Sequence, residues 1–318
     1  MSKQPYAIGI DVGGTTTKFG VVSRDGKILE QDRIPSNAHE SVEDFIEDLH
    51  KKLMPMVKKI GGIDKVAGIG MGAPNANFYS GNIEYAPNLV WKGIIPMAEL
   101  MTKKFGITTK LTNDANAAAV GEMIYGCTKD IKHFITITLG TGVGSGIVVD
   151  GKILLGHDGF AGELGHTIIR PGGRLHKSTG MHGSLEAYAS ATGVRETAIE
   201  LLTEHPETES LLRDYSINEL TSESVYDCAM KGDAIANRIF EFTGQILGES
   251  LANFIMFSSP EVIVLFGGLT KAGNLLLNPT RKHMEANLLP IFQNKVKLLF
   301  SELKEADAAI LGASALVW

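Results

Sequence analysis

Apolar positions along the chain follow two patterns, short continuous runs and longer stretches in which they recur every three or four residues. The first pattern predicts strands and the second predicts helices. Strands are expected at 6–10, 19–22, 66–71, 108–112, 134–139, 146–149 and 262–266. Helices are expected at 41–60, 113–125, 233–257 and 306–316, with Pro55 kinking the first of them or ending it early. Alternation of strands and helices predicts an α/β protein.

Two stretches of the chain resemble each other. Residues 10–22 and 137–149 each join two apolar strands through a turn rich in Gly and Thr. Each stretch is soon followed by the same five residues, Asp-Gly-Lys-Ile-Leu, at 25–29 and 150–154. Chance similarity of two amphipathic hairpins is the alternative, and the repeated pentapeptide disfavours it. We therefore expect two related α/β halves with a cleft between them. Their expected bounds are 1–115, joined by the C-terminal helix 306–318, and 116–305.

Length and composition restrict the class of protein. The chain has 318 residues, enough for two domains with separate cores, and its net charge of -6 argues against a nucleic-acid or membrane partner. No apolar run is long enough to span a bilayer, and the residues before Tyr6 show no signal-peptide pattern, so a cytoplasmic location is expected. Cys127 and Cys228 form neither a disulfide framework nor a cysteine-rich metal site.

Three turns rich in Gly, Thr and Ser follow apolar strands, at 13–17, 140–145 and 267–268. Backbone N–H groups in such turns converge on anions. One glycine turn is usually only a hairpin turn, but three predict a polyphosphate site. Neither a P-loop nor a dinucleotide-binding Gly motif is present. The residues assigned to this polyphosphate site are Asp11, Gly13, Gly14, Thr15, Thr16, Lys18, Gly140, Thr141, Gly142, Gly267 and Gly268.

Two carboxylates stand beside these turns. Asp11 ends the first strand, where it can hold Mg²⁺ next to phosphate groups, and a turn-capping Asp is the alternative. Asp114 lies between a strand and a helix in the sequence Asn113-Asp114-Ala115-Asn116. Taken alone, it is favoured as a helix cap. Together with the phosphate turns, it is favoured as the base that accepts the proton of an attacking sugar hydroxyl.

Polar side chains among small residues form a further candidate group. Glu163 and His166 stand three positions apart in a glycine-rich stretch, and Glu186 follows. A lone His is more often a structural residue than a ligand. Because two carboxylates accompany His166, we interpret the three residues as a site for a ligand with several hydroxyl groups.

Together these motifs resemble the ROK family of bacterial sugar kinases and related repressors, over essentially the whole chain. The motifs are Asp11-Val12-Gly13-Gly14-Thr15, Gly72-Ala73-Pro74, Asn88-Leu89-Val90-Trp91, Asn113-Asp114-Ala115-Asn116, the block from Leu139 to His166, Leu185-Glu186-Ala187-Tyr188-Ala189-Ser190, and Gly267-Gly268. The resemblance implies an actin-like (ribonuclease H-like) two-domain sugar kinase fold, with ATP and Mg²⁺ as cofactors and a homodimer as the assembly. It is closest to bacterial glucokinases, so glucose is the first expected substrate.

The resemblance also implies roles for individual residues. It makes Asp114 the catalytic base toward the sugar O6. It implies sugar contacts from Asn88, Asn113, Asp114, Glu163, His166 and Glu186.

The sequence departs from the family pattern at two places. Asn75 stands where the family has Gly after Gly72-Ala73-Pro74, and Asn also tolerates the left-handed backbone. The family's zinc site, formed by a His and three Cys, would require Cys at the positions of Lys177, Thr179 and Ser184. We therefore expect no zinc, although a site of His166, His176 and His182 is conceivable.

Other functions stay open at this point. Within the enzymes, the substrate can be N-acetylglucosamine, N-acetylmannosamine, fructose or allose. A sugar-responsive transcriptional regulator is disfavoured because the first hairpin begins by Tyr6, which leaves no room for a helix-turn-helix. A sugar-binding protein without catalysis is disfavoured by Asp11 and Asp114.

Overall fold

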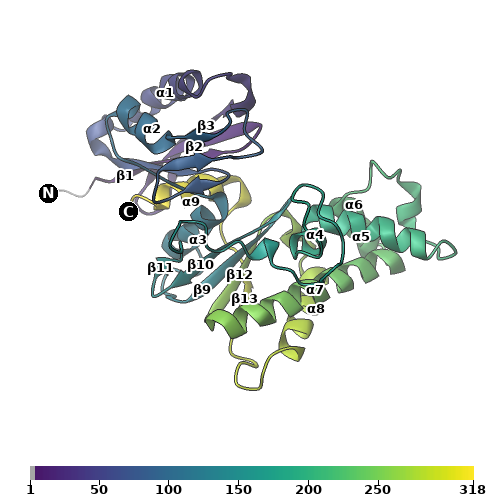
Figure 1. Ribbon diagram of the computed structural model, residues 1–318. Coiled ribbons are helices and arrows are strands. Elements are labelled where there is room, and N and C mark those ends of the chain that lie inside the picture. Colours follow the sequence, from purple (N-terminus) through teal and green to yellow (C-terminus); the bar gives the residue numbers. More distant parts are fainter. Residues whose placement is uncertain (1–3) are drawn as a thin grey trace. The chain divides into compact units, whose positions relative to one another are not determined.

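The computed structural model describes residues 4–318 and contains a five-stranded sheet near the start of the chain (Figure 1). The sheet has the strand order β3-β2-β1-β4-β8, in which β1, β2 and β3 pair antiparallel, and β4 and β8 add in parallel. The strands are β1 (Tyr6–Val12), β2 (Thr16–Ser23), β3 (Ile28–Pro35), β4 (Val66–Gly72) and β8 (Thr109–Thr112). The first predicted hairpin is therefore confirmed.

A second five-stranded sheet repeats this plan. Its order is β11-β10-β9-β12-β13, with β12 parallel to both β9 and β13, and β10 antiparallel to β11. The strands are β9 (Phe134–Leu139), β10 (Val143–Val149), β11 (Lys152–Ile153), β12 (Val262–Phe266) and β13 (Lys297–Phe300). Since each sheet begins with a three-strand meander and continues with two parallel strands, the expected duplication of the halves is confirmed.

Helices and short strands complete the chain. A small sheet is formed by β5 (Ala76–Asn77), β6 (Asn82–Glu84) and β7 (Ile94–Ile95). The α-helices are α1 (Val42–Lys59), α2 (Met97–Phe105), α3 (Asp114–Tyr125), α4 (Glu186–Ala189), α5 (Ala191–Glu204), α6 (Ser222–Met230), α7 (Ala234–Ser258), α8 (Asn274–Ala286) and α9 (Glu305–Ala315). Short 3₁₀ helices are η1 (Ser36–Ala38), η2 (Ile63–Lys65), η3 (Leu164–His166), η4 (Leu211–Asp214) and η5 (Gly268–Ala272).

Helix α1 corrects one expectation. It does not end early at Pro55 but continues to Lys59, after starting at Val42 behind a Ser41 cap. The missing N–H of Pro55 leaves the Lys51 carbonyl without its helical donor, and Lys51 is exposed, so water can supply one. Buried Val57 lies beyond the proline and keeps the last turn packed.

Helix α9 approaches the first sheet very closely. A Cβ atom placed on Gly70 would lie 1.8 Å from the carbonyl oxygen of Ala313, and one on Gly9 would lie 2.0 Å from that of Ile310. Real Cβ atoms do not approach so near, so only glycine permits this packing. The C-terminal helix is thereby packed directly on the sheet that contains the N-terminal hairpin.

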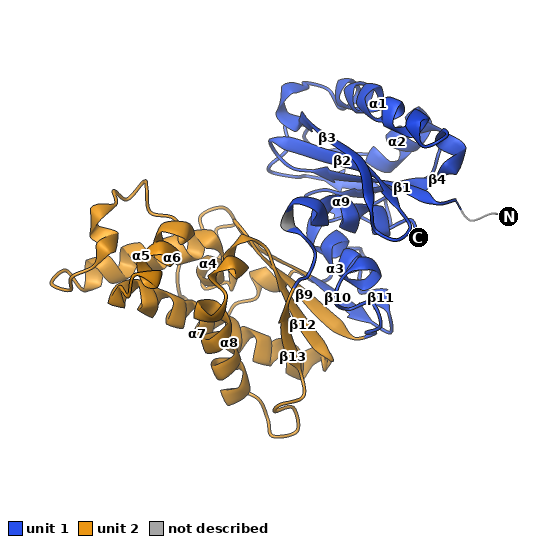
Figure 2. Ribbon diagram, turned by 180° about the vertical axis from the view of Figure 1, so that it is seen from behind, with its two compact units in different colours: residues 1–132, 146–162, 301–318 blue, residues 133–145, 163–300 orange. Residues whose placement is uncertain are grey.

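Contacts divide the chain into two compact units (Figure 2). The first comprises residues 1–132, 146–162 and 301–318, and the second comprises 133–145 and 163–300. The chain passes from one unit to the other inside β10. The domain division predicted at residues 115 and 306 stays a prediction.

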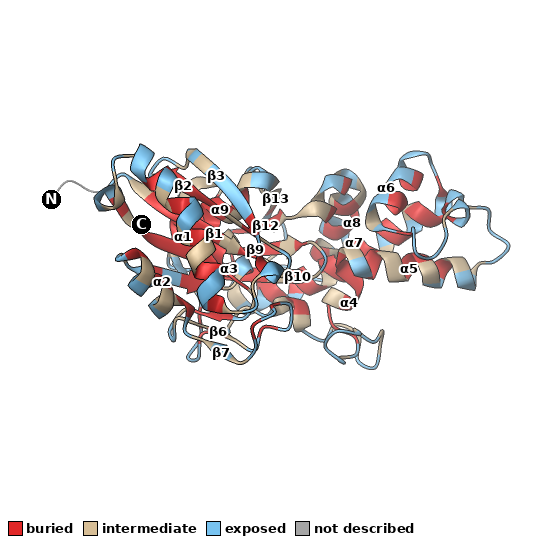
Figure 3. Cartoon of the chain, turned by 90° about the horizontal axis from the view of Figure 1, so that it is seen from above, coloured by how far each residue is buried: buried red, intermediate tan, exposed pale blue. Residues whose placement is uncertain are grey.

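Buried positions concentrate on the central strands and on α7 (Figure 3). In the first unit, Ile8, Ile10, Phe19 and Met71 belong to one apolar cluster with α1 side chains such as Phe45. Within residues 4–318, no helix has the length and apolar character needed to cross a membrane. The core thus fixes the strand ends that carry the candidate residues.

Candidate active site

The first glycine turn joins β1 and β2. The Gly13 N–H donates to the Thr16 carbonyl at 3.1 Å, and a Cβ on Gly13 would lie 2.9 Å from that oxygen. Helix η1 contacts this turn through Ser36. Ser36 donates its N–H to the Thr15 carbonyl at 2.9 Å, and its hydroxyl lies 2.7 Å from the buried hydroxyl of Thr17. The turn is therefore held in shape without any contribution from a ligand.

Asp11 lies at the end of β1, directly before this turn. Burial is the main cause that raises its pKa from 3.8 to about 6, and the negative charge of Asp114 acts in the same direction. Lys18, its register partner on β2, partly offsets the shift. A carboxylate destabilised by burial and by a second carboxylate is a favourable ligand for a cation.

Asp114 is the first residue of α3, and it is not the helix cap. The cap is Asn113, whose side chain accepts the Asn116 N–H at 2.7 Å. Asp114 accepts only the adjacent Ala115 N–H, at 2.9 Å, among the hydrogen bonds recorded for its side chain. Burial raises the pKa of Asp114, against the lowering effect of that bond. Asp114 is therefore available to bind a proton.

Gly72, at the end of β4, lies between the two carboxylates. A Cβ placed on it would lie 3.7 Å from the Cα of Asp114 and 3.8 Å from an oxygen of Asp11. Parallel pairing of β1 with β4, and of β4 with β8, brings these strand ends to one edge of the first sheet. The sequence prediction that Asp11 and Asp114 act in one place is consistent with this arrangement.

The exposed residue Asn88 lies in the loop between β6 and β7 and packs on the first turn. A Cβ on Gly14 would lie 2.6 Å from the Asn88 carbonyl oxygen. Asn75 adopts the left-handed backbone, with φ of 51°, as the sequence suggested. Its amide donates to the Glu84 carbonyl at 3.1 Å, which fixes the start of the Asn88 loop.

The second glycine turn lies between β9 and β10 and contacts Glu186. One Glu186 oxygen accepts the Val143 N–H at 2.6 Å, and a Cβ on Gly142 would lie 2.3 Å from that oxygen. The N–H of Ala191 donates to the Gly140 carbonyl at 2.8 Å. The Thr141 carbonyl likewise accepts a hydrogen bond from the Thr192 hydroxyl at 3.1 Å. The turn is thus tied to the start of α4 and α5.

The third turn packs on the second. Gly267 has φ of 105°, and a Cβ there would lie 2.6 Å from the carbonyl oxygen of Leu139, which directly precedes Gly140. Gly268 follows as the first residue of η5. Both glycine turns at the end of this sheet are therefore neighbours, as the phosphate hypothesis requires.

Glu163, His166 and Glu186 lie in the second unit. His166 ends η3, with its Nε2 3.8 Å from an oxygen of Glu163. The buried Nδ1 of His166 has no hydrogen-bond partner among residues 4–318. In that part of the chain, no group of three or more His, Cys, Asp or Glu side chains is placed to hold a metal ion.

The sequence did not identify Arg174 as a functional residue, and it offered His176 only as a conceivable zinc ligand. His176 Nε2 lies 3.1 Å from the second oxygen of Glu186, and both side chains are only 14% exposed. The Arg174 guanidinium binds groups of α4 and α5. Their spacing from Glu186 follows no helix or strand period, so no sequence pattern reveals the contact.

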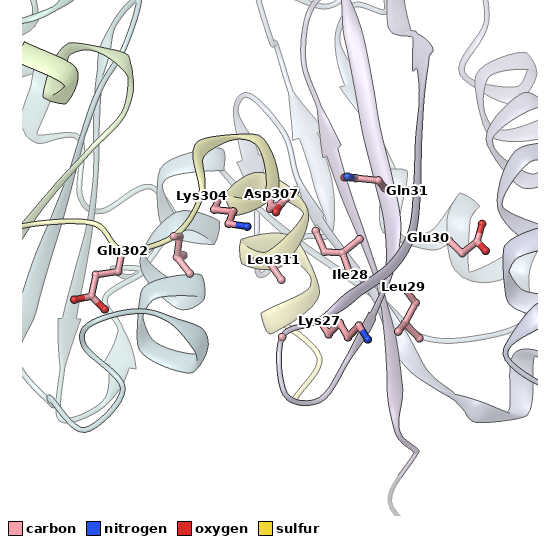
Figure 4. Close-up of a pocket in the computed structure, with 11 residues that line it drawn as sticks. Lys27, Ile28, Leu29, Glu30, Gln31, Glu302, Lys304, Asp307 and Leu311 are labelled. Atoms are coloured by element: carbon pink, nitrogen blue, oxygen red, sulfur yellow. The ribbon is translucent and has the colours of Figure 1, made fainter.

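One surface pocket of about 500 Å³ lies in the first unit, between β3 and the segment leading into α9 (Figure 4). Ile28 and Leu311 pack together there, and Lys27, Lys304 and Asp307 add charges of both signs. Among the described residues, its lining includes none of the candidates above. The pocket therefore does not bear on the chemistry of Asp11 and Asp114.

Comparison with known proteins points to one group. Residues 7–318 match the sequence model of the ROK family. A glucokinase of Halalkalibacterium halodurans is 36% identical over 100% of this chain and 96% of its own length. A glucokinase of Thermotoga maritima is 32% identical over 98% and 96%. The solved structure of a ROK family glucokinase from Streptomyces griseus, in complex with glucose and AMPPNP, is 29% identical with a TM-score of 0.79, covering 98% of both chains.

Proposed function

The chain belongs to the ROK family, and we propose on that premise that it is an ATP-dependent glucokinase that phosphorylates the 6-hydroxyl of glucose. The expectation of a sugar kinase with an actin-like α/β fold is confirmed by the same comparisons. The named activity of the two bacterial relatives and the glucose complex of the Streptomyces griseus enzyme support glucose among the hexoses.

The observation that carries the proposal is the state of Asp114. Asp114 reaches solvent, but the protein around it desolvates its carboxylate and raises its pKa, and Asn113 relieves it of helix capping. Such a group accepts a proton more readily than an ordinary Asp does. In the proposed reaction, Asp114 takes the proton from the sugar hydroxyl as its oxygen bonds to the terminal phosphorus of ATP, and ADP departs.

The glycine turns and Asp11 would handle the phosphate charge. Gly13, Gly14, Thr15, Thr16 and Lys18 would contact the phosphates in the first unit, and Gly140, Thr141, Gly142, Gly267 and Gly268 in the second. Asp11 fits a Mg²⁺ ion, because its half-buried carboxylate oxygens are hard ligands and its pKa is raised by burial and by the charge of Asp114, which a cation would offset. When bound, Mg²⁺ supplies positive charge to the phosphoryl group under transfer.

Six side chains are proposed to contact the sugar. They are Asn88, Asn113, Asp114, Glu163, His166 and Glu186. The fixed geometry of Glu186, whose oxygen accepts the Val143 N–H at 2.6 Å, supports its role as an oriented acceptor for sugar hydroxyls.

A panel of hexoses tests the activity. Mg²⁺-dependent ADP release should be most efficient with glucose and weaker with N-acetylglucosamine, N-acetylmannosamine, fructose and allose. Absence of turnover with every sugar would refute the kinase proposal. A higher kcat/KM for another hexose would reassign the substrate and keep the reaction.

Asp114→Asn tests the role of the base. We expect kcat to fall by about 10²–10⁴-fold, with little change in glucose affinity, since the amide cannot accept the proton. Asp130→Asn, an exposed residue beyond α3, is the matched control and should behave as wild type. Wild-type turnover in Asp114→Asn would reduce Asp114 to a structural residue.

A homodimer and a cytoplasmic location stay predictions. Sedimentation of the purified protein would measure the first, and fractionation of cells would measure the second. Neither result alters the chemistry proposed for Asp114.

A further inference from the structure

The loop between η3 and α4 is ordered by backbone pairing and by side-chain hydrogen bonds. Two isolated β-bridges close it, Ile168 with Ser184 and Leu175 with His182. His182 Nδ1 also lies 3.0 Å from the Gly173 carbonyl oxygen. At the positions where the family carries cysteines, this loop has Lys177, Thr179 and Ser184 instead. Its shape must therefore come from other groups.

Arg174 supplies most of the attachment to the helices. Its Nη1 donates to the carbonyls of Ala187 at 2.7 Å and Gly193 at 3.0 Å, and its Nη2 to the Thr197 hydroxyl at 2.9 Å. Its Nε donates to Glu200 at 2.8 Å, and a second Glu200 oxygen accepts from Nη2. All five N–H donors of the guanidinium are thus used, and the side chain is 9% exposed.

His176 extends from this anchored loop to Glu186. Its Nδ1 lies 2.9 Å from the Thr179 hydroxyl, and that hydroxyl oxygen accepts the Met181 N–H at 3.3 Å. A carboxylate oxygen only accepts hydrogen bonds, so Nε2, which faces Glu186, carries a ring proton. Nε2 therefore donates to the Glu186 carboxylate, 3.1 Å away.

Glu186 is consequently held from two sides. The Val143 N–H of the second glycine turn binds one oxygen, and His176 binds the other. The side chains of His176 and Glu186 are each 14% exposed, so water competes only weakly for the hydrogen bond between them. Since one carboxylate is shared by a loop and by the turn, the position of the loop is transmitted to the turn through Glu186.

We propose that His176 is a positioning residue that fixes the Glu186 carboxylate for sugar binding, in a loop that Arg174 orders without a metal. The proposal rests on the proposed function in that Glu186 contacts the sugar. It assigns a role to a residue that is not among the six proposed sugar contacts. Its effect should appear in glucose binding rather than in the chemical step, because uniform binding changes KM and not kcat.

Three variants test the proposal by steady-state kinetics. His176→Ala should raise the glucose KM by about tenfold, the range of one hydrogen bond to a charged group, with kcat and the ATP KM nearly unchanged. His176→Gln should restore most of the affinity, because its amide N–H can replace the Nε2 donor. His182→Ala removes a histidine of the same loop whose side chain hydrogen-bonds Gly173 rather than Glu186, and should leave the glucose KM unchanged.

Amide hydrogen exchange provides a readout that does not need activity. In His176→Ala, the Val143 amide should exchange faster than in wild type, while His182→Ala should leave it protected. An unchanged glucose KM and unchanged Val143 protection in His176→Ala would overturn the proposal. So would an equal KM increase in His182→Ala, or failure of His176→Gln to improve on His176→Ala. If wild type phosphorylates no hexose, the proposed function fails, and Val143 exchange still decides the role of His176.

Discussion

The pKa of the Asp11 carboxylate, at the end of β1, depends on burial and on two neighbouring charges. Burial and Asp114 raise its pKa to about 6, and Lys18 lowers it. Below that pH the group is increasingly protonated and neutral, so it binds a cation less well. Activity that depends on ionised Asp11 is therefore lost as the pH falls through about 6.

Lys18→Met should move this acid limb to higher pH. Removal of the ammonium group eliminates the one charge that lowers the Asp11 pKa, so protonation begins earlier as the pH falls. The measurement is kcat/KM for ATP between pH 5 and pH 8. This range extends from about one pH unit below the expected midpoint to about two units above it. A lower activity with an unshifted limb would contradict the electrostatic coupling of Lys18 to Asp11.

Two glycines of one turn should respond differently to alanine. In Gly142→Ala the new Cβ meets the Glu186 oxygen, so the glucose KM should rise and the melting temperature should fall. In Gly140→Ala the Cβ meets no described atom within 4 Å, so the melting temperature should be kept. Any effect of Gly140→Ala should appear in the ATP KM. Equal losses of stability in the two variants would contradict this view of the turn.

The limits of sequence reasoning are clear at Asn113 and Asp114. Both residue types cap helices well, and the chain pattern does not decide which of them is the first helical residue. The structure makes Asn113 the cap, so the alternative assignment of Asp114 as a cap is wrong. The contact of His176 with Glu186 was not expected, because the two residues lie across an irregular loop, where no period relates them.

At the scale of elements, α9 depends on small residues in the strands beneath it. Gly70→Ala should destabilise the protein by several kcal/mol, because a Cβ would lie 1.8 Å from the backbone of Ala313 and the helix would have to move. Chemical denaturation measures the change. Ala67→Ser, a partly exposed position of the same strand, is the control and should lose little stability.

The outcome of the Gly70 experiment distinguishes two views of α9. If Gly70→Ala kept wild-type stability, the helix would have to be able to shift away from the sheet at little cost. The close approach of α9 to β4 would then not be required for folding.

The sequence predicts most readily the strands whose two faces are both buried. β1, β4, β9 and β12 show continuous apolar runs and were expected from them. β3 was not expected, because it is an edge strand whose positions are mostly exposed and polar. Its place in the sheet depends on pairing with β2 rather than on burial, and a hydrophobic pattern cannot report pairing.

At the scale of the whole molecule, the two sheets show how far the internal repeat extends. The pentapeptide at 25–29 and 150–154 revealed only the two meanders, whereas the structure extends the correspondence to β4 and β8 against β12 and β13. Those parallel strands share no evident sequence similarity. In both sheets, the same strand order places buried parallel strands beside the meander.

Zinc content is a further prediction about the whole molecule. The purified protein should contain no stoichiometric zinc, and it should regain full activity after chelation once Mg²⁺ is restored. Hydrogen bonds of Arg174 and His176 already order the loop, so the loop does not need a metal ion for its stability. About one zinc per chain, lost together with activity, would contradict this and point to His166, His176 and His182.

The hydrogen-bonded loop has a consequence for how the enzyme meets oxidative stress. Thiolates that close a loop open it when they are oxidised, whereas a guanidinium has no comparable redox chemistry. The two cysteines elsewhere are poor targets, since burial and Glu122 raise the Cys127 pKa to about 12 and Cys228 is buried. In a cell exposed to peroxide, this enzyme should therefore keep phosphorylating sugar while enzymes that depend on a thiolate are inactivated.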